Sequence, residues 1–403
     1  MITAASKSYC ERKRRTLNTA TDKDKIPILD VGRFVGAVIV VFVHYETIFG
    51  SPIVYGTLGT TFLSWFFVLS GFILSYNYPE IIGRAGYFRF YSHRVIRIFP
   101  AYLLAVFVSA AFVSIGYLSL TDQFWEEVHR PLQLRFDLPE DLGPQFWVRA
   151  TVAHVTFTQS LSEIQSLNLV FNGPLWSLVL EMYFYVSFPF WLIVLRRADT
   201  LLRILLSMLG LYVLQFCLIQ SWLPPGENLG LAELNIPVYT NPIVRGSEFI
   251  LGMLLYRIHL LRPPEIFGRI HPLWLLPAVA LYLGTVYLAQ NYLPYQYGSF
   301  YLSVPAVTLI VFVMSRLDWA PNDLQHRFCF FLGGVSYVLY CFHWPLMEML
   351  QFFDLLPQTL PVMLHSVLLA FVLLVFCTII YLYAEVPLRR RLRRLLNSPQ
   401  VKS

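Results

Sequence analysis

Charged side chains are scarce in this chain. Only 13% of its 403 residues are Asp, Glu, Lys or Arg, about half the usual share of a soluble globular domain. Hydrophobic residues make up 57% of the chain and aromatic residues 16%. This composition excludes an ordinary soluble domain of that length. The sequence therefore predicts an all-α fold, a polytopic bundle of membrane-spanning helices.

Metal-binding cysteine patterns are also missing. The five cysteines show no CxxC or similar spacing, and four of them lie in apolar stretches. Cysteines in such surroundings usually act as small hydrophobic core residues, so we assign no metal site to this chain. No internal repeat is evident either, although transporters are often built from such repeats.

Ten stretches are long and apolar enough to cross about 30 Å of hydrocarbon as helices. They cover approximately residues 28–49, 57–76, 98–118, 175–195, 203–223, 243–261, 273–290, 299–315, 330–350 and 362–384. Ten crossings place both ends of the chain on the same side of the membrane.

The net charge of +6 is distributed unevenly. Basic residues cluster in alternate connections of the ten-span arrangement, at residues 7–25, 84–97, 196–203, 257–269, 316–327 and 389–394. By the positive-inside rule these connections and both termini are cytoplasmic. Membrane orientation thus accounts for the positive charge, and no nucleic-acid partner is needed. The long connection over residues 119–174 belongs to the outer face and has seven acids against three arginines.

A histidine and an arginine lie inside the first span. His44 follows Arg33 by eleven residues, an offset of about 1100° that puts both side chains on one helix face, about 16 Å apart along the axis. Ionisable groups within a membrane span are costly and usually belong to a functional site. Asp30 stands three residues before Arg33 and can pair with it, which lowers that cost. We therefore expect Arg33 and His44 to face one cavity without touching.

Two further arginines, Arg94 and Arg97, stand three residues apart at the predicted cytoplasmic end of the third span. On a helix they share one face and form a fork that can bind phosphate oxygens. Arginines beside a span also occur simply because of the positive-inside rule, or because they bind lipid headgroups. The spacing alone does not decide between these interpretations.

Three more charged residues fall inside predicted spans. Glu181 lies near the start of the fourth span and needs a partner, a proton or water, so it is either a structural contact or part of a site. Arg245 and Glu248 repeat the i, i+3 pairing of opposite charges at the start of the sixth span. We expect this second pair to be mainly structural and to line the same cavity.

Small and helix-distorting residues mark two other spans. Ser70 and Gly71 lie among bulky residues in FFVLSGFILSY, which predicts close approach of another helix. His343 precedes Pro345 in SYVLYCFHWPLM. Proline frees a backbone carbonyl that His343 or water can satisfy, which favours a packing or kink role for this histidine over catalysis.

With these residues in place, the chain resembles the acyltransferase-3 family from about residue 26 to residue 394. The resemblance rests on the order of six motifs: LDxxR followed by His44, FFVLSGFILS, RxxR followed by IFPAY, GPLWSLxxE, RGSEFILGM, and SYxLYxxHWP with a later ExP at Glu385 and Pro387. Two motifs depart from the usual form. DVGRFVG stands where the family commonly has DGLRG, and VLEMYF stands where it commonly has SVEEQF, which leaves Glu181 as the only carboxylate there.

The resemblance implies an integral membrane O-acyltransferase. Such an enzyme moves an acyl group, most often acetyl, from acyl-CoA to a hydroxyl of a carbohydrate or glycolipid, and it holds no bound cofactor. It implies membrane lipids as surroundings, no nucleic-acid partner, and a multi-pass location in a bacterial cytoplasmic membrane. The expected domains are a basic, disordered cytoplasmic segment over residues 1–27, a transmembrane acyltransferase domain over residues 28–388, and a basic cytoplasmic tail over residues 389–403.

The same resemblance suggests roles for individual residues. His44 is the expected general base, Arg33 acts between donor and base, and Glu181 either orients His44 or holds the sugar. Arg94 and Arg97 are the expected binding residues for the donor phosphates. Residues expected to be structural or to line the cavity are Asp30, Trp176, Arg245, Glu248 and His343.

Two other functions fit buried ionisable residues. A transporter or flippase of a glycan or lipid-linked sugar also places Arg, Asp, Glu and His inside the membrane. A noncatalytic scaffold or sensor is the third alternative, and in it His44 and Glu181 are replaceable without chemical consequence. The sequence leaves open the acceptor, the acyl chain length and the choice between direct transfer and an acyl-histidine intermediate.

Overall fold

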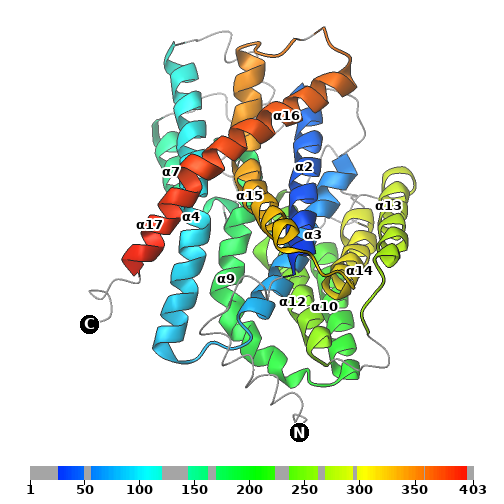
Figure 1. The fold of residues 1–403 in the computed structure, drawn as a ribbon. Coiled ribbons are helices and arrows are strands. Elements are labelled where there is room, and N and C mark those ends of the chain that lie inside the picture. Colours follow the sequence, from blue (N-terminus) through cyan, green and yellow to red (C-terminus); the bar gives the residue numbers. More distant parts are fainter. Residues whose placement is uncertain are drawn as a thin grey trace.

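The computed structural model describes residues 26–49, 56–119, 144–161, 169–222, 236–261, 268–293, 297–357 and 359–396. Over these residues the chain forms helices and contains no strand (Figure 1). The all-α prediction is thereby confirmed. Almost all of the segment predicted to be disordered, residues 1–27, and the end of the predicted tail lie outside the described ranges.

A helix occupies each of the ten predicted positions. These helices are α2 (Pro27–Phe49), α3 (Gly56–Asn77), α4 (Gly83–Ser119), α9 (Trp176–Val194), α10 (Leu201–Trp222), α12 (Pro242–Leu261), α13 (Leu275–Asn291), α14 (Ser303–Arg316), α15 (Asp323–Phe352) and α16 (Val362–Ile380). Shorter elements join or extend them: α7 (Pro144–Val155), η3 (Gln159–Leu161), η4 (Gly173–Leu175), η5 (Leu195–Arg197), α11 (Ile236–Tyr239), η6 (Pro272–Trp274), η7 (Tyr297–Leu302), η8 (Tyr381–Glu385) and α17 (Val386–Leu396).

Seven helical stretches among the described residues are long and apolar enough to cross a membrane. The apolar parts of α3 and α14 are shorter, at Thr61–Asn77 and Phe300–Arg316. Helix α12 carries three charged residues, Arg245, Glu248 and Arg257, which lower its hydropathy. The protein is therefore an integral membrane protein with several spans, while the number of ten crossings stays a prediction.

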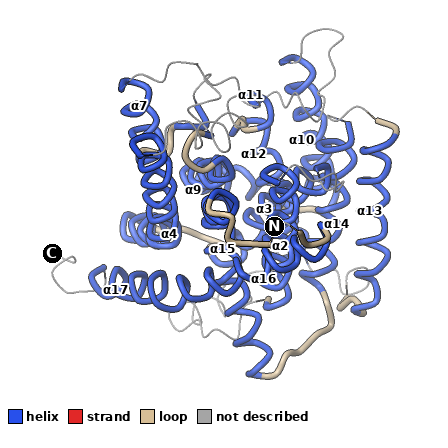
Figure 2. The backbone as a smooth tube through the Cα atoms, turned by 90° about the horizontal axis from the view of Figure 1, so that it is seen from above, coloured by secondary structure: helices blue, strands red, loops and turns tan. Residues whose placement is uncertain are grey.

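The helices form one bundle with α2, α3 and α15 near its centre. In Figures 1 and 2, α4 and α7 lie at one edge of the bundle and α13 lies at the opposite edge. Helix α2 packs against α15 and α3, and α3 packs against α12. Large apolar side chains on α10, α13 and α16 are exposed, including Leu209, Leu283 and Phe371. Exposed apolar side chains on the outer helices are suited to contact with lipid tails.

The basic connections meet at one end of the bundle. Arg257, in the last turns of α12, donates a hydrogen bond from Nε to the carbonyl oxygen of Ala198 at 3.2 Å, in the connection between α9 and α10. The backbone of Ile270 bonds to Arg316 and Asp318, which joins the connection before α13 to the connection after α14. This placement agrees with the charge alternation in the sequence. Which membrane face this end adopts stays a prediction.

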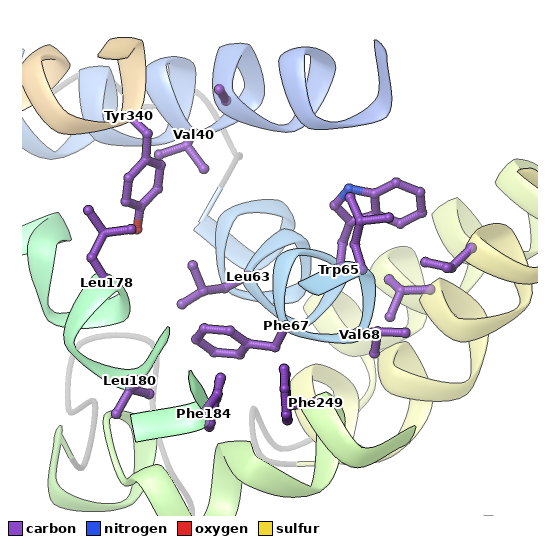
Figure 3. Close-up of a cluster of buried hydrophobic side chains, with 14 of the residues drawn as sticks. Val40, Leu63, Trp65, Phe67, Val68, Leu178, Leu180, Phe184, Phe249 and Tyr340 are labelled. Atoms are coloured by element: carbon purple, nitrogen blue, oxygen red, sulfur yellow. The ribbon is translucent and has the colours of Figure 1, made fainter. Parts of the chain in front are cut away.

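Two glycines allow α3 and α12 to cross in backbone contact. A Cβ atom on Gly71 would lie 1.9 Å from the carbonyl oxygen of Phe249, and a Cβ atom on Gly252 would lie 1.9 Å from that of Val68. The close helix approach predicted at Ser70 and Gly71 is confirmed. Beside the crossing, the rings of Phe67, Phe184 and Phe249 pack together (Figure 3), with Phe184 stacked on Phe249 at 4.9 Å between centroids.

Alanine at either glycine should therefore destabilise the bundle. We expect Gly71→Ala and Gly252→Ala each to lower the free energy of unfolding by about 3 kcal/mol, because the new methyl group must push two backbones apart. Gly210→Ala and Gly284→Ala are matched controls, since no atom lies within 4 Å of a Cβ at either helical position. Thermal unfolding of the purified protein in detergent measures the difference. Equal midpoints for all four variants would contradict this helix crossing.

Candidate active site

A cavity of about 500 Å³ opens between α2, α3, α4, α9, α15 and α17. It lies at the end of the bundle where α2 begins and α3 ends, because Ile26 and Asn77 are among its lining residues. Five of the residues predicted from the sequence also line it: Asp30, Arg33, Arg94, Arg97 and Glu181. Residues separated by about 150 positions in the chain are thus brought to one space.

Asp30 and Arg33 form the predicted ion pair. Nη1 of Arg33 lies 3.2 Å from Oδ1 of Asp30, and both side chains are partly exposed to the cavity. Gly333 of α15 makes room for this pair, since a Cβ atom there would lie 2.6 Å from Oδ1 of Asp30. The pair holds the guanidinium at the cavity wall, and the other N–H groups of a guanidinium are donors suited to an anion.

Arg94 and Arg97 both line the cavity, as their i, i+3 spacing predicts. The guanidinium of Arg94 lies over the rings of Tyr78 and Tyr185, at 5.1 and 5.5 Å, and that of Arg97 lies over Tyr337 at 4.8 Å. Nη2 of Arg94 also donates to the hydroxyl of Tyr78 at 3.2 Å. Stacking on aromatic faces fixes a guanidinium and leaves part of its N–H donors suited to bind an anion.

Glu181 also faces the cavity, and neutral hydroxyl groups hold it. Ser70 donates a hydrogen bond from Oγ to Oε1 of Glu181 at 3.3 Å, and the hydroxyl of Tyr185 donates to the same oxygen. These contacts come from the cavity wall and do not include His44. Of the two roles expected for Glu181, the arrangement therefore favours contact with a ligand over orientation of His44.

His44 is not among the residues that line this cavity. It lies three turns further along α2, where its ring is nearly parallel to that of His343 with 5.0 Å between centroids. The ring of Trp344 is almost perpendicular to that of His44, with 5.2 Å between centroids. Tyr340 stands between the two regions, because it lines the cavity and its ring lies 5.7 Å from that of His343. Figure 3 shows Tyr340 extending from α15 toward Leu178 of α9. The expectation that Arg33 and His44 face one cavity is therefore wrong for this cavity, because only Arg33 lines it.

The hydrogen bonds of the two histidines define their tautomers. Nδ1 of His343 lies 2.8 Å from the carbonyl oxygen of Tyr340 and 3.1 Å from that of Leu339. Carbonyl oxygens only accept, so Nδ1 of His343 carries the proton and its Nε2 is the acceptor in the neutral ring. Nε2 of His343 lies 2.8 Å from Nδ1 of His44. His44 therefore donates from Nδ1, and its basic nitrogen is Nε2.

Pro345 does not account for His343. Proline at this position removes the helical donor to the carbonyl of Cys341, four residues earlier. Nδ2 of Asn172 donates to that carbonyl at 3.0 Å. The expectation that His343 or water satisfies the freed carbonyl is therefore wrong, because an asparagine from the segment before α9 does so. The polar contact of His343 across the bundle is with His44.

Arg245, Glu248 and Trp176 are buried away from the cavity. Nη1 of Arg245 lies 2.6 Å from Oε1 of Glu248, and the two side chains are only 1% and 0% exposed. Gln215 donates to the same carboxylate oxygen at 3.1 Å, and the ring of Trp176 packs on Tyr239. The predicted ion pair is present, and its structural role stays a prediction. The expectation that it lines the same cavity is wrong, because aromatic and apolar side chains enclose it.

Sequence reasoning missed the contribution of α17. Arg389, Arg390 and Arg393 line the cavity, although the sequence analysis placed them in a basic tail that starts at residue 389. In the structure that boundary falls inside α17, which continues from α16 and reaches α4 (Figure 1). The i, i+1, i+4 spacing of these arginines, directly after the ExP motif, is the signal that indicates a shared helix face.

Comparison with known proteins identifies the family of the chain. The acyltransferase domain family matches residues 26–382, which is most of the chain and includes His44, Arg33, Glu181 and both arginines of the RxxR motif. The chain belongs to the acyltransferase-3 family. This assignment makes the protein a membrane acyltransferase.

Two relatives share this domain. The acyltransferase MdmB of Streptomyces mycarofaciens is 24% identical over 300 residues, covering 71% of this chain and 68% of the relative. The putative peptidoglycan O-acetyltransferase YrhL of Bacillus subtilis (strain 168) is 27% identical over 225 residues, covering 53% of this chain. The alignment spans only 34% of the length of YrhL. No solved structure matches this family member significantly.

Proposed function

We propose that this acyltransferase moves an acyl group, in the simplest case acetyl, from acyl-CoA to a hydroxyl of a carbohydrate or glycolipid. The observation that carries the proposal is the charge of the cavity. Six arginines line it against two carboxylates, counted over the part of the chain that the structure describes. Such an excess of guanidinium groups favours a ligand with phosphate groups. Acyl-CoA combines phosphates with a transferable acyl group.

The position of the cavity supports a donor that enters from the cytosol. Its mouth lies at the end of the bundle where the basic connections meet, and the positive-inside rule makes that end cytoplasmic. We propose a bacterial cytoplasmic membrane with both termini inside. The acceptor then reaches His44 from the other half of the bundle. The name of the relative YrhL, a putative peptidoglycan O-acetyltransferase, supports an acetyl group and a glycan acceptor.

The chemistry that we propose is direct transfer with His44 as general base. Nε2 of His44 removes the proton of the acceptor hydroxyl while the hydroxyl oxygen bonds to the thioester carbonyl carbon. The carbon–sulfur bond then breaks, sulfur keeps the electron pair, and the proton passes from His44 to the leaving thiolate. The products are the ester and free CoA thiol. General base catalysis of this kind contributes typically about 10²- to 10⁴-fold.

The other cavity residues bind the donor in this scheme. Arg33 lies about 16 Å along α2 from His44, too far to touch the reacting carbonyl, so it contacts the donor on its way to the histidine. Glu181 accepts hydrogen bonds and suits the amide N–H groups of the pantetheine arm. The acyl end passes Tyr340, which borders both the cavity and the histidine pair.

Mass spectrometry of surface glycans and lipids, with and without the protein, tests the activity directly. The expected result is that one glycan or lipid is heavier by one acyl group when the protein is present. Purified protein with acetyl-CoA and the identified acceptor should also release free thiol. A transporter or flippase would move the glycan without thiol release. Acceptor acylation that is independent of the protein would overturn the proposal.

Replacement of the RxxR arginines tests the donor site. We expect Arg94→Gln with Arg97→Gln to weaken acetyl-CoA binding about 10- to 100-fold, since hydrogen bonds to charged groups contribute about 1.5–3 kcal/mol. Arg196→Gln with Arg197→Gln removes the same charge from an exposed connection at the same end of the bundle and should leave affinity unchanged. Calorimetric titration of the detergent-solubilised proteins measures both. If the Arg94 and Arg97 variant bound acetyl-CoA as tightly as the wild type, these arginines would serve only membrane orientation.

A further inference from the structure

Helix α17 places arginines on two different faces. Arg389, Arg390 and Arg393 line the cavity, whereas Arg391 and Arg394 of the same helix do not. Leu388 and Leu395 are exposed on the remaining side. The helix is thus amphipathic. One basic face lines the cavity, a second basic face lies outside it, and leucines occupy the remaining side.

The cavity face of α17 faces the basic residues of α4. Helix α17 packs against α4, and Arg389 is close enough to Arg97 and Arg393 for their charges to interact. Arg393 in turn interacts with His93, one turn before Arg97. Glu385 pairs with Arg389 at 2.9 Å, and Asp30 pairs with Arg33. Like charges in a partly desolvated space repel unless an anion lies between them.

The basic residues follow an order of depth. Arg94 and Arg97 are partly buried, and Nε of Arg94 is fully enclosed without a hydrogen bond to any residue that the structure describes. Arg390 and Arg393 are exposed at the rim. In CoA the thioester arm comes first, the diphosphate follows, and the 3′-phosphate lies at the far end of the nucleotide. A donor whose arm points inward therefore brings its 3′-phosphate to the rim.

We infer that Arg390 and Arg393 form a recognition site for the 3′-phosphate of the CoA donor, above the diphosphate held by Arg94 and Arg97. This inference rests on the proposed function and adds donor specificity to it. A phosphate monoester carries close to two negative charges at neutral pH and three acceptor oxygens, which match two guanidinium groups on adjacent turns. The enzyme should therefore distinguish CoA thioesters from thioesters that lack the 3′-phosphate.

The test compares two double variants of α17 with two donors. Arg390→Gln with Arg393→Gln removes the rim arginines and keeps the Arg389–Glu385 ion pair, so the helix retains its anchor. Arg391→Gln with Arg394→Gln is the matched control, with the same charge removed from the same helix. The donors are acetyl-CoA and 3′-dephospho-acetyl-CoA, and each protein is measured in nanodiscs of phosphatidylcholine and in nanodiscs that contain anionic lipid.

The wild-type protein should bind acetyl-CoA about 10- to 100-fold more tightly than the dephospho donor, from the usual strength of charged hydrogen bonds. The rim variant should lose that preference and bind both donors alike. The control variant should retain the preference. Removing the rim arginines and removing the 3′-phosphate from the donor abolish the same contact. Their effects on donor affinity should therefore not add.

Three outcomes would overturn the inference. A rim variant that keeps its preference for the phosphorylated donor, or a control variant that loses it equally, would show that α17 contributes only general charge. A preference that depends on anionic lipid would assign these arginines to lipid headgroups. Wild-type protein that binds neither donor would instead overturn the proposed function, so the two failures are distinguishable.

Discussion

Replacing His44 with alanine should reduce acyl transfer about 10²- to 10⁴-fold, the usual contribution of a general base. The change removes the ring whose Nε2 is basic because Nδ1 donates to His343. Donor affinity should change little, because His44 is not among the residues that line the proposed donor cavity. Release of CoA thiol, followed as a function of acceptor and donor concentration, separates the loss in kcat from any change in donor KM.

His271→Ala is the control for this loss. His271 is exposed and is the N-cap residue of η6, before α13, far from the histidine pair in the sequence. The control should keep wild-type activity, and both variants should unfold at the wild-type temperature. Near wild-type activity in His44→Ala would contradict a catalytic role of His44. This holds for His44 as general base in direct transfer and for His44 as the site of an acyl-histidine intermediate.

Replacing His343 with phenylalanine should lower kcat by about 100-fold or more while donor KM stays constant. Phenylalanine cannot accept the Nδ1 proton of His44, so the half-buried imidazole of His44 loses the contact that keeps Nε2 basic. In serine proteases a triad residue that fails to hold the correct histidine tautomer costs about 10⁴-fold. His343 would then act as a positioning residue through His44.

The conservative variant distinguishes positioning from packing. In His343→Gln the amide can donate to a main-chain carbonyl and accept from His44, as the imidazole does, so a large part of the activity should return. A purely structural role of the ring predicts instead that phenylalanine, which keeps an aromatic ring at this position, supports activity at least as well as glutamine. Wild-type kcat in His343→Phe would therefore contradict the positioning role.

Ion pairs within one helix were predicted correctly from the sequence. Asp30 with Arg33 and Arg245 with Glu248 are both at i, i+3, and the structure contains both pairs. Such contacts depend only on helical geometry, which each apolar segment supplies by itself. The same local rule placed Arg94 and Arg97 on one face.

Contacts between helices were not predictable in this way. His44 and His343 are 299 residues apart, and proximity to a proline suggested a different role for the second histidine. The α17 arginines were interpreted as topological signals, because nothing in their local sequence shows that the helix packs against α4. The burial of Arg245 and Glu248 outside the cavity likewise depends on the surrounding helices.

The sequence by itself determined the class of the protein, its helical membrane-embedded architecture, its family and the ionisable residues that we propose for its chemistry. These features follow from apolar length, charge alternation and the order of motifs, all of which act locally along the chain. Only the tertiary structure decided that a cationic cavity and a histidine pair lie on opposite sides of Tyr340. Side-chain packing decides which helix faces meet, because lipid tails offer no hydrophobic preference among apolar helix faces.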